Sequence, residues 1–471
     1  MTFKQSRELS MSRRDLIKSG SLSGLGMTLA LGCDGEEPGN TANPYVTSMQ
    51  LTSEEQDQLD GRKGRTIQKV METLCRYGDF YGADVFVPTE GPSHLVMGWS
   101  QQAVFGPIYP IVEELVREGY KIDAGFTIDP RPMDFAHENL SSIQETTARL
   151  MFAGQDSWES DLRRLGLRDD KAFSCACYVK EMGNTPKPGQ ILAWAESSAV
   201  SFANSALGAR TNRNSSTIEI FCGIIGKAPR FGFLTDAGRR AVARIDVRTS
   251  KMPMAEQLGE IMGDLMLDGV PLITGLDSWI GKTINDDVQD YLKDMGAAAA
   301  SRGAVGLYHV ENLTPDAVDK GSAILKDDVP VFVIDDSLVA KTVGGFGVPW
   351  RDPSARPEMV VLGCPHLSRN QVNQWTDRIE KGLAEKGRRR VAVNTIFATP
   401  PPVRDQVKAE MGARLDRLGI TVASMCSLMH CMNPLLATSR LLTNSAKLRN
   451  YSTARYAAND DVLRAILGEA I

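Results

Sequence analysis

The strongest constraint on this chain is a regular alternation of short apolar runs with helical patterns, which starts near Leu51 and continues to the C-terminus. Strands that alternate with helices of ordinary length predict an α/β protein with mostly parallel sheets. In such sheets, the loops after the carboxyl ends of the strands form the ligand crevice. The expected strands are 83–88, 122–128, 173–178, 270–273, 304–308, 329–334, 359–362 and 391–396, and the expected helices are 108–120, 142–152, 284–300, 369–386 and 404–418.

Length, charge and cysteine content limit the possible classes further. A single hydrophobic core stops growing near about 250–300 residues, so a chain of 471 residues is expected to form at least two packed lobes. The net charge of −5 leaves no basic surplus, which argues against nucleic-acid binding. Eight cysteines are too few for a disulfide scaffold, and no CxxC pair occurs. Any metal must therefore be held by cysteines that are distant in sequence.

The first fifty residues are predicted to be an export signal and a linker. The adjacent Arg13 and Arg14 precede an apolar run over 19–32, which is shorter than the roughly 20 residues that a membrane-spanning helix needs. Residues 1–33 therefore read as a twin-arginine signal peptide, with a destination in the periplasm or at the outer face of the cytoplasmic membrane. Cys33 follows Gly32 as in a lipoprotein cleavage box, so both a lipid anchor at Cys33 and simple release stay open. Residues 34–50 are expected to be a flexible linker.

The densest cluster of polar side chains lies between Trp194 and Arg213. Its Ser, Asn and Arg side chains supply hydrogen-bond donors suited to a carboxylate or phosphate, and its small residues allow close packing of the backbone. The alternative interpretation is a helix of small residues that ends in a polar cap.

Two cysteines follow apolar strands. Cys364 comes after 360–362, and Cys426 comes after 422–425, so both are expected at the carboxyl-end rim of one sheet, close to each other. The alternative for each is a buried structural cysteine at a turn. The stretch 443–447 looks like a polar turn that opens a helix, in which Ser445 could be the cap. Pro400–Pro402 are expected to form a turn or a stiff connector.

The segment 194–213 resembles the motif Trp-x-Glu-Ser-x-Ala-Val…Ala-Asn-Ser…Gly-Ala-Arg-Thr-Asn-Arg of the aconitase X family. Other motifs resemble those of the same family in the same order, from Leu51 to the end of the chain. The resemblance implies an aconitase-like fold of several lobes, built as α/β/α layers. The further motifs are the loop 88–94 with His94, Asp129-Pro130, the loop 175–184 that starts at Cys175, 362–366 and 443–447.

Members of this family are dehydratases, with phosphomevalonate and cis-3-hydroxyproline among their substrate classes. The resemblance implies an iron or iron–sulfur centre that polarises the departing hydroxyl group while a base removes a proton from the adjacent carbon. Catalytic roles would fall to Ser197, Ser198, Ser445 and Lys447; substrate binding to His94, Glu196, Asn204, Arg210, Thr211, Asn212 and Arg213; and metal binding to Cys364 and Cys426, completed by Cys431 or His366.

The chain also departs from the family pattern. A further cysteine expected near 459–463 is absent, and Asp129 stands where the family has asparagine. We find no small swivel domain in this chain, which implies a separate small subunit. Two functions therefore stay open: an iron-dependent hydro-lyase acting on a small hydroxy acid, and a metal-free exported member of the family that only binds a small anionic ligand.

Overall fold

A computed structural model of the chain describes residues 45–96, 106–138, 140–433 and 439–471. The expected signal peptide, including Arg13, Arg14 and Cys33, lies outside these residues. The chain divides into two compact units, 1–44 and 45–471, and the second is described here. Within the described part of the chain, no helix is both long enough and apolar enough to cross a membrane.

The first part of the unit, up to about residue 237, joins short strands to helices that bury one apolar face. Helix α3 packs Val70, Met71 and Leu74 into the core and is followed by Gly82, whose φ of 72° suits a glycine that caps a helix end. Strand β1 pairs antiparallel with β4, and β2 pairs parallel with β3. The elements are α2 (Ser53–Leu59), α3 (Arg65–Tyr81), β1 (Phe86–Pro88), β2 (Ser93–Leu95), α5 (Ile108–Arg117), β3 (Phe126–Ile128), α6 (Ser142–Met151), α7 (Gln155–Leu165), α8 (Ser197–Ser205), α9 (Ser216–Ile225) and β4 (Lys227–Pro229).

The middle part holds a parallel sheet in the order β7-β6-β5-β8. The backbones of helices α10 and α12 approach each other closely. A Cβ atom at Gly259 would lie only 2.3 Å from the Met295 carbonyl oxygen. Glycine is therefore required where these two backbones approach. The elements are β5 (Ala243–Val247), α10 (Ala255–Met266), β6 (Pro271–Thr274), α11 (Asp277–Ile280), α12 (Asp286–Arg302), β7 (His309–Val310), α13 (Pro315–Lys320), β8 (Val331–Ile334) and α14 (Asp336–Gly344).

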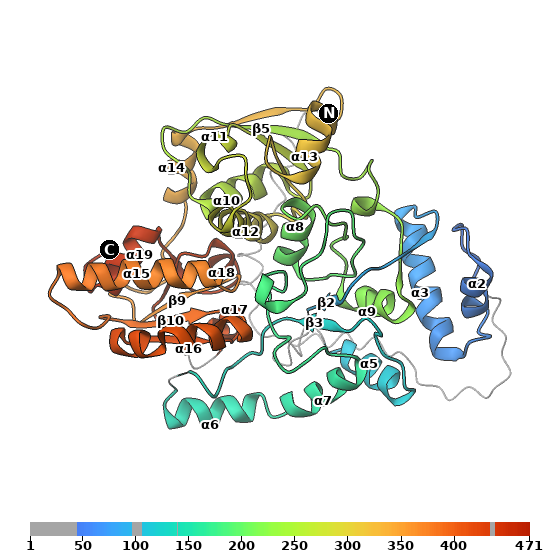
Figure 1. Cartoon of the computed structure of the whole chain (residues 1–471), viewed down its shortest axis with the longest axis horizontal. Helices are drawn as coiled ribbons and strands as arrows, with labels where there is room; N and C mark the ends of the chain where they lie inside the picture. The colour runs from blue at the N-terminus through green and yellow to red at the C-terminus, as the bar shows by residue number, and fades with distance from the viewer. Residues whose placement is uncertain (1–44, 97–105, 139, 434–438) are drawn as a thin grey trace. The chain divides into compact units, whose positions relative to one another are not determined.

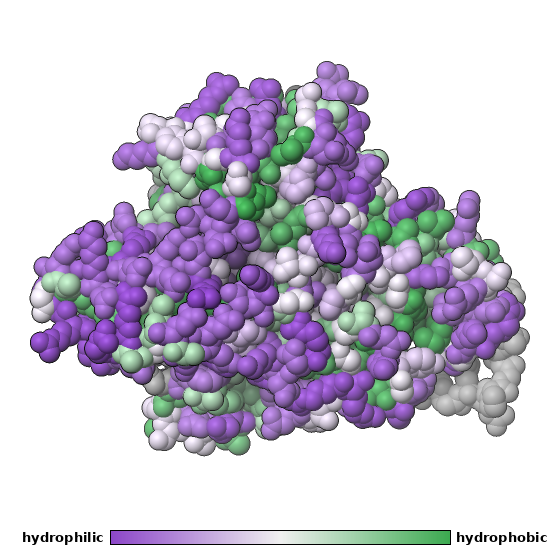
Figure 2. Space-filling view, viewed as in Figure 1, coloured by the Kyte–Doolittle hydropathy of each residue, from purple (hydrophilic) through white to green (hydrophobic). Residues whose placement is uncertain are grey.

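The last part holds a second parallel sheet, in the order β11-β10-β9-β12-β13. Thr395 of β10 pairs with Val360 of β9 and with Ile420 of β11. Helices α15 and α16 flank β9 and β10 (Figure 1), and hydrophilic residues cover their outer surface (Figure 2). The elements are β9 (Met359–Leu362), α15 (Arg369–Glu385), β10 (Asn394–Ala398), α16 (Pro401–Leu418), β11 (Ile420–Ala423), α17 (Ser427–Met432), β12 (Leu441–Thr443), α18 (Ala446–Tyr451), β13 (Arg455–Tyr456) and α19 (Asn459–Ile466).

The predicted α/β class with mostly parallel sheets is confirmed, and three local predictions are wrong. The expected strand over 173–178 is reduced to a single bridge between Phe173 and Ile128. Residues 304–308 do not form a strand, and the strand is β7, which follows them. Pro401 and Pro402 open α16 rather than form a connector, because proline fits the first turn of a helix, where its missing N–H is not needed.

The last six residues of the expected linker are folded, and the rest of it, 34–44, lies outside the described residues. Residues 45–50 belong to the folded unit: the Tyr45 hydroxyl donates to Asp79 at 2.6 Å, and Gln50 forms a bridge with Val85. Their polar composition indicated a tether, but Asp79 at the end of α3 supplies an acceptor that holds them.

Candidate functional site

A cavity of about 680 Å³ opens where several strands end. Asp129 follows β3, Cys364 follows β9 and Cys426 follows β11, so their side chains arrive from carboxyl ends of strands. Segments from the first and the last part of the unit meet at its walls. The ionisable and thiol-bearing lining residues are Asp129, Cys175, Glu196, Arg213, Cys364, His366, Cys426, Lys447 and Tyr451, and Ser197 lines the cavity as well.

A buried ion pair joins the two parts at this cavity. The Lys447 ammonium lies 2.5 Å from Glu196 Oε1, although 251 residues separate them in sequence. Glu196 also caps α8, where its Oε2 accepts from the Ala199 N–H and from the Ser198 hydroxyl, each at 2.6 Å. The Lys447 ammonium donates in addition to the Ser198 hydroxyl oxygen at 3.3 Å. The expected residues Glu196, Ser198 and Lys447 thus form one network.

The charges of this pair stabilise each other. Burial opposes the ionised form of Glu196, but the charge of Lys447 and its hydrogen bond lower the pKa of Glu196 to about 2. Burial alone would lower the pKa of Lys447, yet the charge of Glu196 raises it well above its usual value. Both groups are therefore ionised at neutral pH, so Lys447 presents a hydrogen-bond donor to the cavity and not a base.

Ser445 and His94 do not line the large cavity, but each forms hydrogen bonds with segments close to it. The Ser445 hydroxyl caps α18 by accepting from the Leu448 N–H at 3.0 Å, and it donates to the Cys364 carbonyl oxygen. His94 is fully buried, and its Nδ1 lies 2.9 Å from the Thr127 hydroxyl oxygen. Burial lowers the pKa of His94 to about 4, which keeps the ring neutral. The described cavity lining includes neither residue.

Three thiols line the cavity, and one of them belongs to a residue that was not among the expected metal ligands. Cys364 and Cys426 share it as their positions after strands predicted, and Cys175 joins them. Burial raises the pKa of Cys364 to about 11 and that of Cys426 to about 12, and it raises the pKa of Cys175 as well. Among the described residues, no three His, Cys, Asp or Glu side chains are gathered as a group that could hold a metal ion. Because their pKa values are raised, the three thiols are protonated at neutral pH unless a bound cation is present.

The two residues expected to complete a metal site are placed differently. Cys431 does not line the cavity, but it is buried in an apolar cluster with Val361 and Leu441, against which Cys364 packs. His366 lines the cavity, but its Nδ1 lies 3.1 Å from the Ser174 hydroxyl oxygen and its Nε2 lies 2.9 Å from the Met425 carbonyl oxygen. Both ring nitrogens of His366 are thus already engaged.

The two arginines of the segment 194–213 line two different cavities. Arg213 lines the cavity, and its buried Nη1 has no hydrogen-bond partner. Arg210 pairs with Asp236 at 2.5 Å on the wall of another cavity. Residues 210–213 are not helical, so the two side chains do not share a helix face.

Three other polar residues of the segment 194–213 form hydrogen bonds with backbone groups. Asn204 donates to the carbonyl oxygens of Thr211 and Gly306 and accepts from the Thr211 N–H at 2.9 Å. Asn212 donates to the Phe231 carbonyl oxygen and accepts from the Phe233 N–H. The Thr211 hydroxyl is buried and lies 3.4 Å from the Trp194 carbonyl oxygen. These contacts fix the turn that carries Arg213.

Asp129 is a lining residue to which the sequence assigned no role. Its Oδ1 is buried without a hydrogen-bond partner, and burial followed by the charge of Glu196 raises the pKa of Asp129 to about 8. Its position directly after a predicted strand was the available signal. Cys175 was also missed, because the strand predicted over 173–178 would have buried it.

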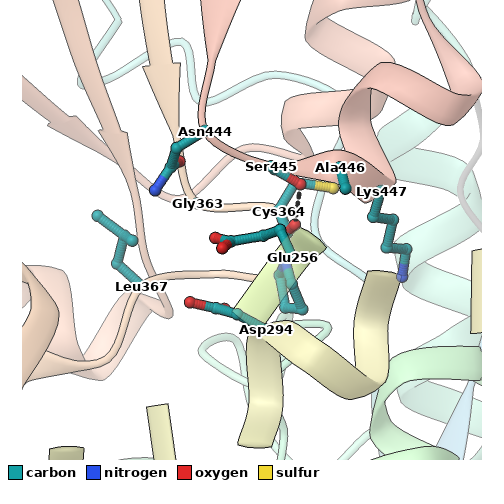
Figure 3. A pocket seen from close by; sticks show the side chains of 10 residues that line it. Glu256, Asp294, Gly363, Cys364, Leu367, Asn444, Ser445, Ala446 and Lys447 are labelled. Atoms are coloured by element: carbon teal, nitrogen blue, oxygen red, sulfur yellow. Dashed lines mark hydrogen bonds between the residues drawn. The ribbon is translucent and has the colours of Figure 1, made fainter. Parts of the chain in front are cut away.

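A smaller cavity of about 10 Å³, enough for one water-sized molecule, lies behind Cys364. Figure 3 shows Cys364 between the carboxyl groups of Glu256 and Asp294 and the side chain of Lys447. Burial and the charge of Asp294 raise the pKa of Glu256 to about 8. The middle part of the unit therefore also reaches the Cys364 loop, through Glu256 and Asp294.

Comparison with known proteins gives a consistent result. Family models described as the first, second and third domains of aconitase X match residues 48–237, 240–344 and 357–462. The chain is 32% identical over 337 residues to a protein of Methanothermobacter thermautotrophicus named phosphomevalonate dehydratase large subunit, covering 71% of this chain and 78% of that protein.

Two further relatives extend the comparison. A cis-3-hydroxy-L-proline dehydratase of Pseudomonas aeruginosa is 31% identical over 299 residues, which cover 60% of this chain and 47% of that protein. The holo-form crystal structure of aconitase X from Thermococcus kodakaraensis superposes with a TM-score of 0.72 and 26% identity, covering 88% of this chain and 99% of that one. The fold and all three parts of the unit therefore have counterparts in one family.

Proposed function

This chain belongs to the aconitase X family, and on that premise we propose that it is a dehydratase that removes water from a small hydroxy acid. The names of its relatives, which act on phosphomevalonate or hydroxyproline, support this reaction class. The observation that carries the proposal is the cavity in which the Glu196–Lys447 pair, the free Arg213 nitrogen and three thiols converge.

The substrate carboxylate is held by Arg213 in this proposal. Its Nη1 is buried, lacks a hydrogen-bond partner and borders the cavity, so a carboxylate would satisfy a donor that is otherwise costly to bury. Lys447 stays protonated beside Glu196 and donates to a substrate oxygen. Ser197, at the start of α8 on the cavity wall, offers a further hydroxyl for orientation.

Iron is the cofactor that we propose, with Cys364 and Cys426 as ligands and Cys175 as the third thiol. The donor chemistry fits, because thiolates are the ligands of iron–sulfur centres and all three thiols border one cavity. Their raised pKa values mean that a bound cation must supply the charge that holds them as thiolates. Bound iron would supply Lewis-acid stabilisation of the departing hydroxyl group.

A separate small subunit is the proposed source of the base. Dehydration needs a base that takes a proton from carbon, and Lys447 is unsuited because it stays protonated. Relatives of this chain are named as large subunits, which supports a smaller partner. Size-exclusion chromatography of the tagged chain from its native host tests this point, and a chain that elutes alone at all concentrations would contradict it.

The second candidate is a metal-free protein that only binds a small anionic ligand. The spacing of the thiols favours it, since no three metal-binding side chains of the described residues are gathered. Iron and sulfide analysis of anaerobically purified chain separates the two candidates. The dehydratase proposal predicts iron that is lost in Cys364→Ser, whereas iron-free protein that still binds a carboxylate would leave ligand binding alone.

We further propose export by the twin-arginine route, to the periplasm or the outer face of the cytoplasmic membrane. Arg13 and Arg14 before an apolar run support it. This route carries folded proteins, which suits a protein that must load its metal before it leaves. Attachment of lipid at Cys33 is tested by mass spectrometry of the mature N-terminus.

A further inference from the structure

The loop over 130–138, here called the crossing loop, follows β3 in the first part of the unit and runs beside the residues that carry Cys426 in the last part. Arg131 forms a parallel bridge with Met425, and the Arg131 carbonyl oxygen accepts from the Cys426 N–H at 2.7 Å. The Ser424 N–H donates to Asp134 Oδ2 at 2.8 Å. The backbone is therefore attached to the crossing loop on both sides of Met425.

Asp134 joins three segments through its carboxylate. Its Oδ2 accepts from the Ser424 N–H, directly after β11, and from Arg404 Nη1 of α16 at 3.0 Å. Its Oδ1 lies 2.8 Å from His137 Nδ1 within the crossing loop. The Asp134 side chain is only 11% exposed. Water competes little for such a carboxylate, and hydrogen bonds to a charged acceptor are the stronger kind, so Asp134 fixes the backbone at Ser424.

The start of the crossing loop is held by the first part of the unit. Arg131 Nε and Nη2 donate to the two carboxylate oxygens of Glu159 in α7, at 2.7 and 2.9 Å. The Arg131 guanidinium also lies 3.7 Å from the centroid of the Phe173 ring. A bidentate pair of this kind fixes orientation as well as distance. The crossing loop is thus a fixed support for 424–426.

We propose that Asp134 is a positioning residue, which holds the Cys426 thiol at the wall of the large cavity by way of the Ser424 N–H. Asp134 is not one of the lining residues of that cavity, so it acts through the backbone. The proposal rests on the proposed function in one respect, the role of Cys426 as a metal ligand. Groups that orient a ligand in this way change metal affinity without touching the metal.

The attachment also sets the place of Cys426 relative to Cys364. The Ser427 hydroxyl donates to the Gly363 carbonyl oxygen at 2.7 Å, so the residues next to the two cysteines are in direct contact. Release of 424–426 from the crossing loop would disturb this contact. The thiols would then no longer be held in one arrangement, as a shared metal centre requires.

Hydrogen–deuterium exchange of the full chain, treated with a chelator, tests the attachment. Asp134→Ala removes the acceptor of the Ser424 N–H, so the amides of 424–426 should exchange about ten- to a hundredfold faster through local opening. Asp134→Asn keeps an acceptor oxygen and should exchange like the unmodified chain. Asp79→Ala is the matched control, because Asp79 also accepts a backbone N–H, from Ser48 at 3.0 Å, but lies outside the cavity lining.

The amides of 360–362 in β9 report global unfolding in the same experiment. The proposal is overturned if exchange at 424–426 is unchanged in Asp134→Ala, or if it rises no more than exchange at 360–362. It is also overturned if Asp79→Ala accelerates 424–426 equally. Asp134→Ser, a milder loss of the acceptor, replaces the alanine variant if that variant does not fold.

Titration with ferrous iron under anaerobic conditions is the second readout. Asp134→Ala should bind iron about ten- to a hundredfold more weakly, whereas Asp79→Ala should keep the affinity of the unmodified chain. Equal affinities of Asp134→Ala and the unmodified chain would overturn the positioning role. The proposed function fails separately: if the unmodified chain binds no iron, the metal role of Cys426 is lost, and the exchange rates alone decide whether Asp134 holds Cys426 in place.

Discussion

Replacing Lys447 with methionine should destabilise the protein strongly. The substitution removes the partner of a carboxylate that lies 2.5 Å away, with both side chains at most 10% exposed. Breaking a buried ion pair by removing one partner costs about 3–5 kcal/mol, because an uncompensated charge stays buried. The double variant Glu196→Gln/Lys447→Met removes both charges and should recover most of this free energy of unfolding.

Urea denaturation followed by tryptophan fluorescence measures the free energy of unfolding. Trp194 is a suitable reporter, because it is buried and lies two residues before Glu196 in the sequence. Lys69→Met is the matched control, because Lys69 pairs with Glu114 at 3.6 Å with both side chains more than a third exposed. Such a surface pair is worth about 0–1 kcal/mol. The reasoning is refuted if Lys447→Met costs no more than Lys69→Met, or if the double variant is as unstable as the sum of its two single variants.

The same pair predicts a pH dependence. The pKa of Glu196 is lowered in the folded state to about 2, so its contribution is complete above the ordinary pKa of a glutamate. The contribution should be lost as pH falls from about 4.5 towards 2. The double variant should lack this part of the acid sensitivity.

Three further outcomes are expected. Changing Arg13 and Arg14 together to lysine should retain the protein in the cytoplasm, as cell fractionation would show, and normal export of that variant would remove the twin-arginine proposal. Arg213→Ala should weaken binding of a carboxylate ligand about ten- to a hundredfold by calorimetry. Arg210→Ala, which loses the pair with Asp236 and the hydrogen bond to the Leu234 carbonyl oxygen, should leave this binding unchanged. Cys426→Ser should lower the iron content of anaerobically purified protein, and Cys431→Ser, in an apolar cluster, should not; equal losses would contradict the ligand assignment.

The periodicity of apolar residues predicted most of the fold, because strands such as 359–362 bury nearly all their side chains and stand out in the sequence. It failed where pairing depends on distant segments. Residues 173–178 have strand-forming side chains, but only Phe173 meets a partner, at Ile128. The proline run at 400–402 was misread because proline marks both turns and helix starts.

The candidate site was predictable in its residue types more than in its geometry. Positions after strands brought Cys364 and Cys426 to one cavity, and the polar segment supplied Glu196 and Arg213. Sequence alone could not separate Arg213 from Arg210, which is three residues away and faces Asp236. It also gave no role to Asp129, because only burial without a hydrogen-bond partner marks that carboxyl group.

Proton NMR in D₂O tests the central claim most directly. The full chain, purified anaerobically from its native host with any partner that it retains, is incubated separately with cis-3-hydroxy-L-proline and with phosphomevalonate. A dehydratase should remove the hydroxyl group of at least one of them, with loss of the signal from the adjacent C–H as the alkene forms. Unchanged spectra for both compounds, from protein that contains iron and retains its partner, would contradict the account.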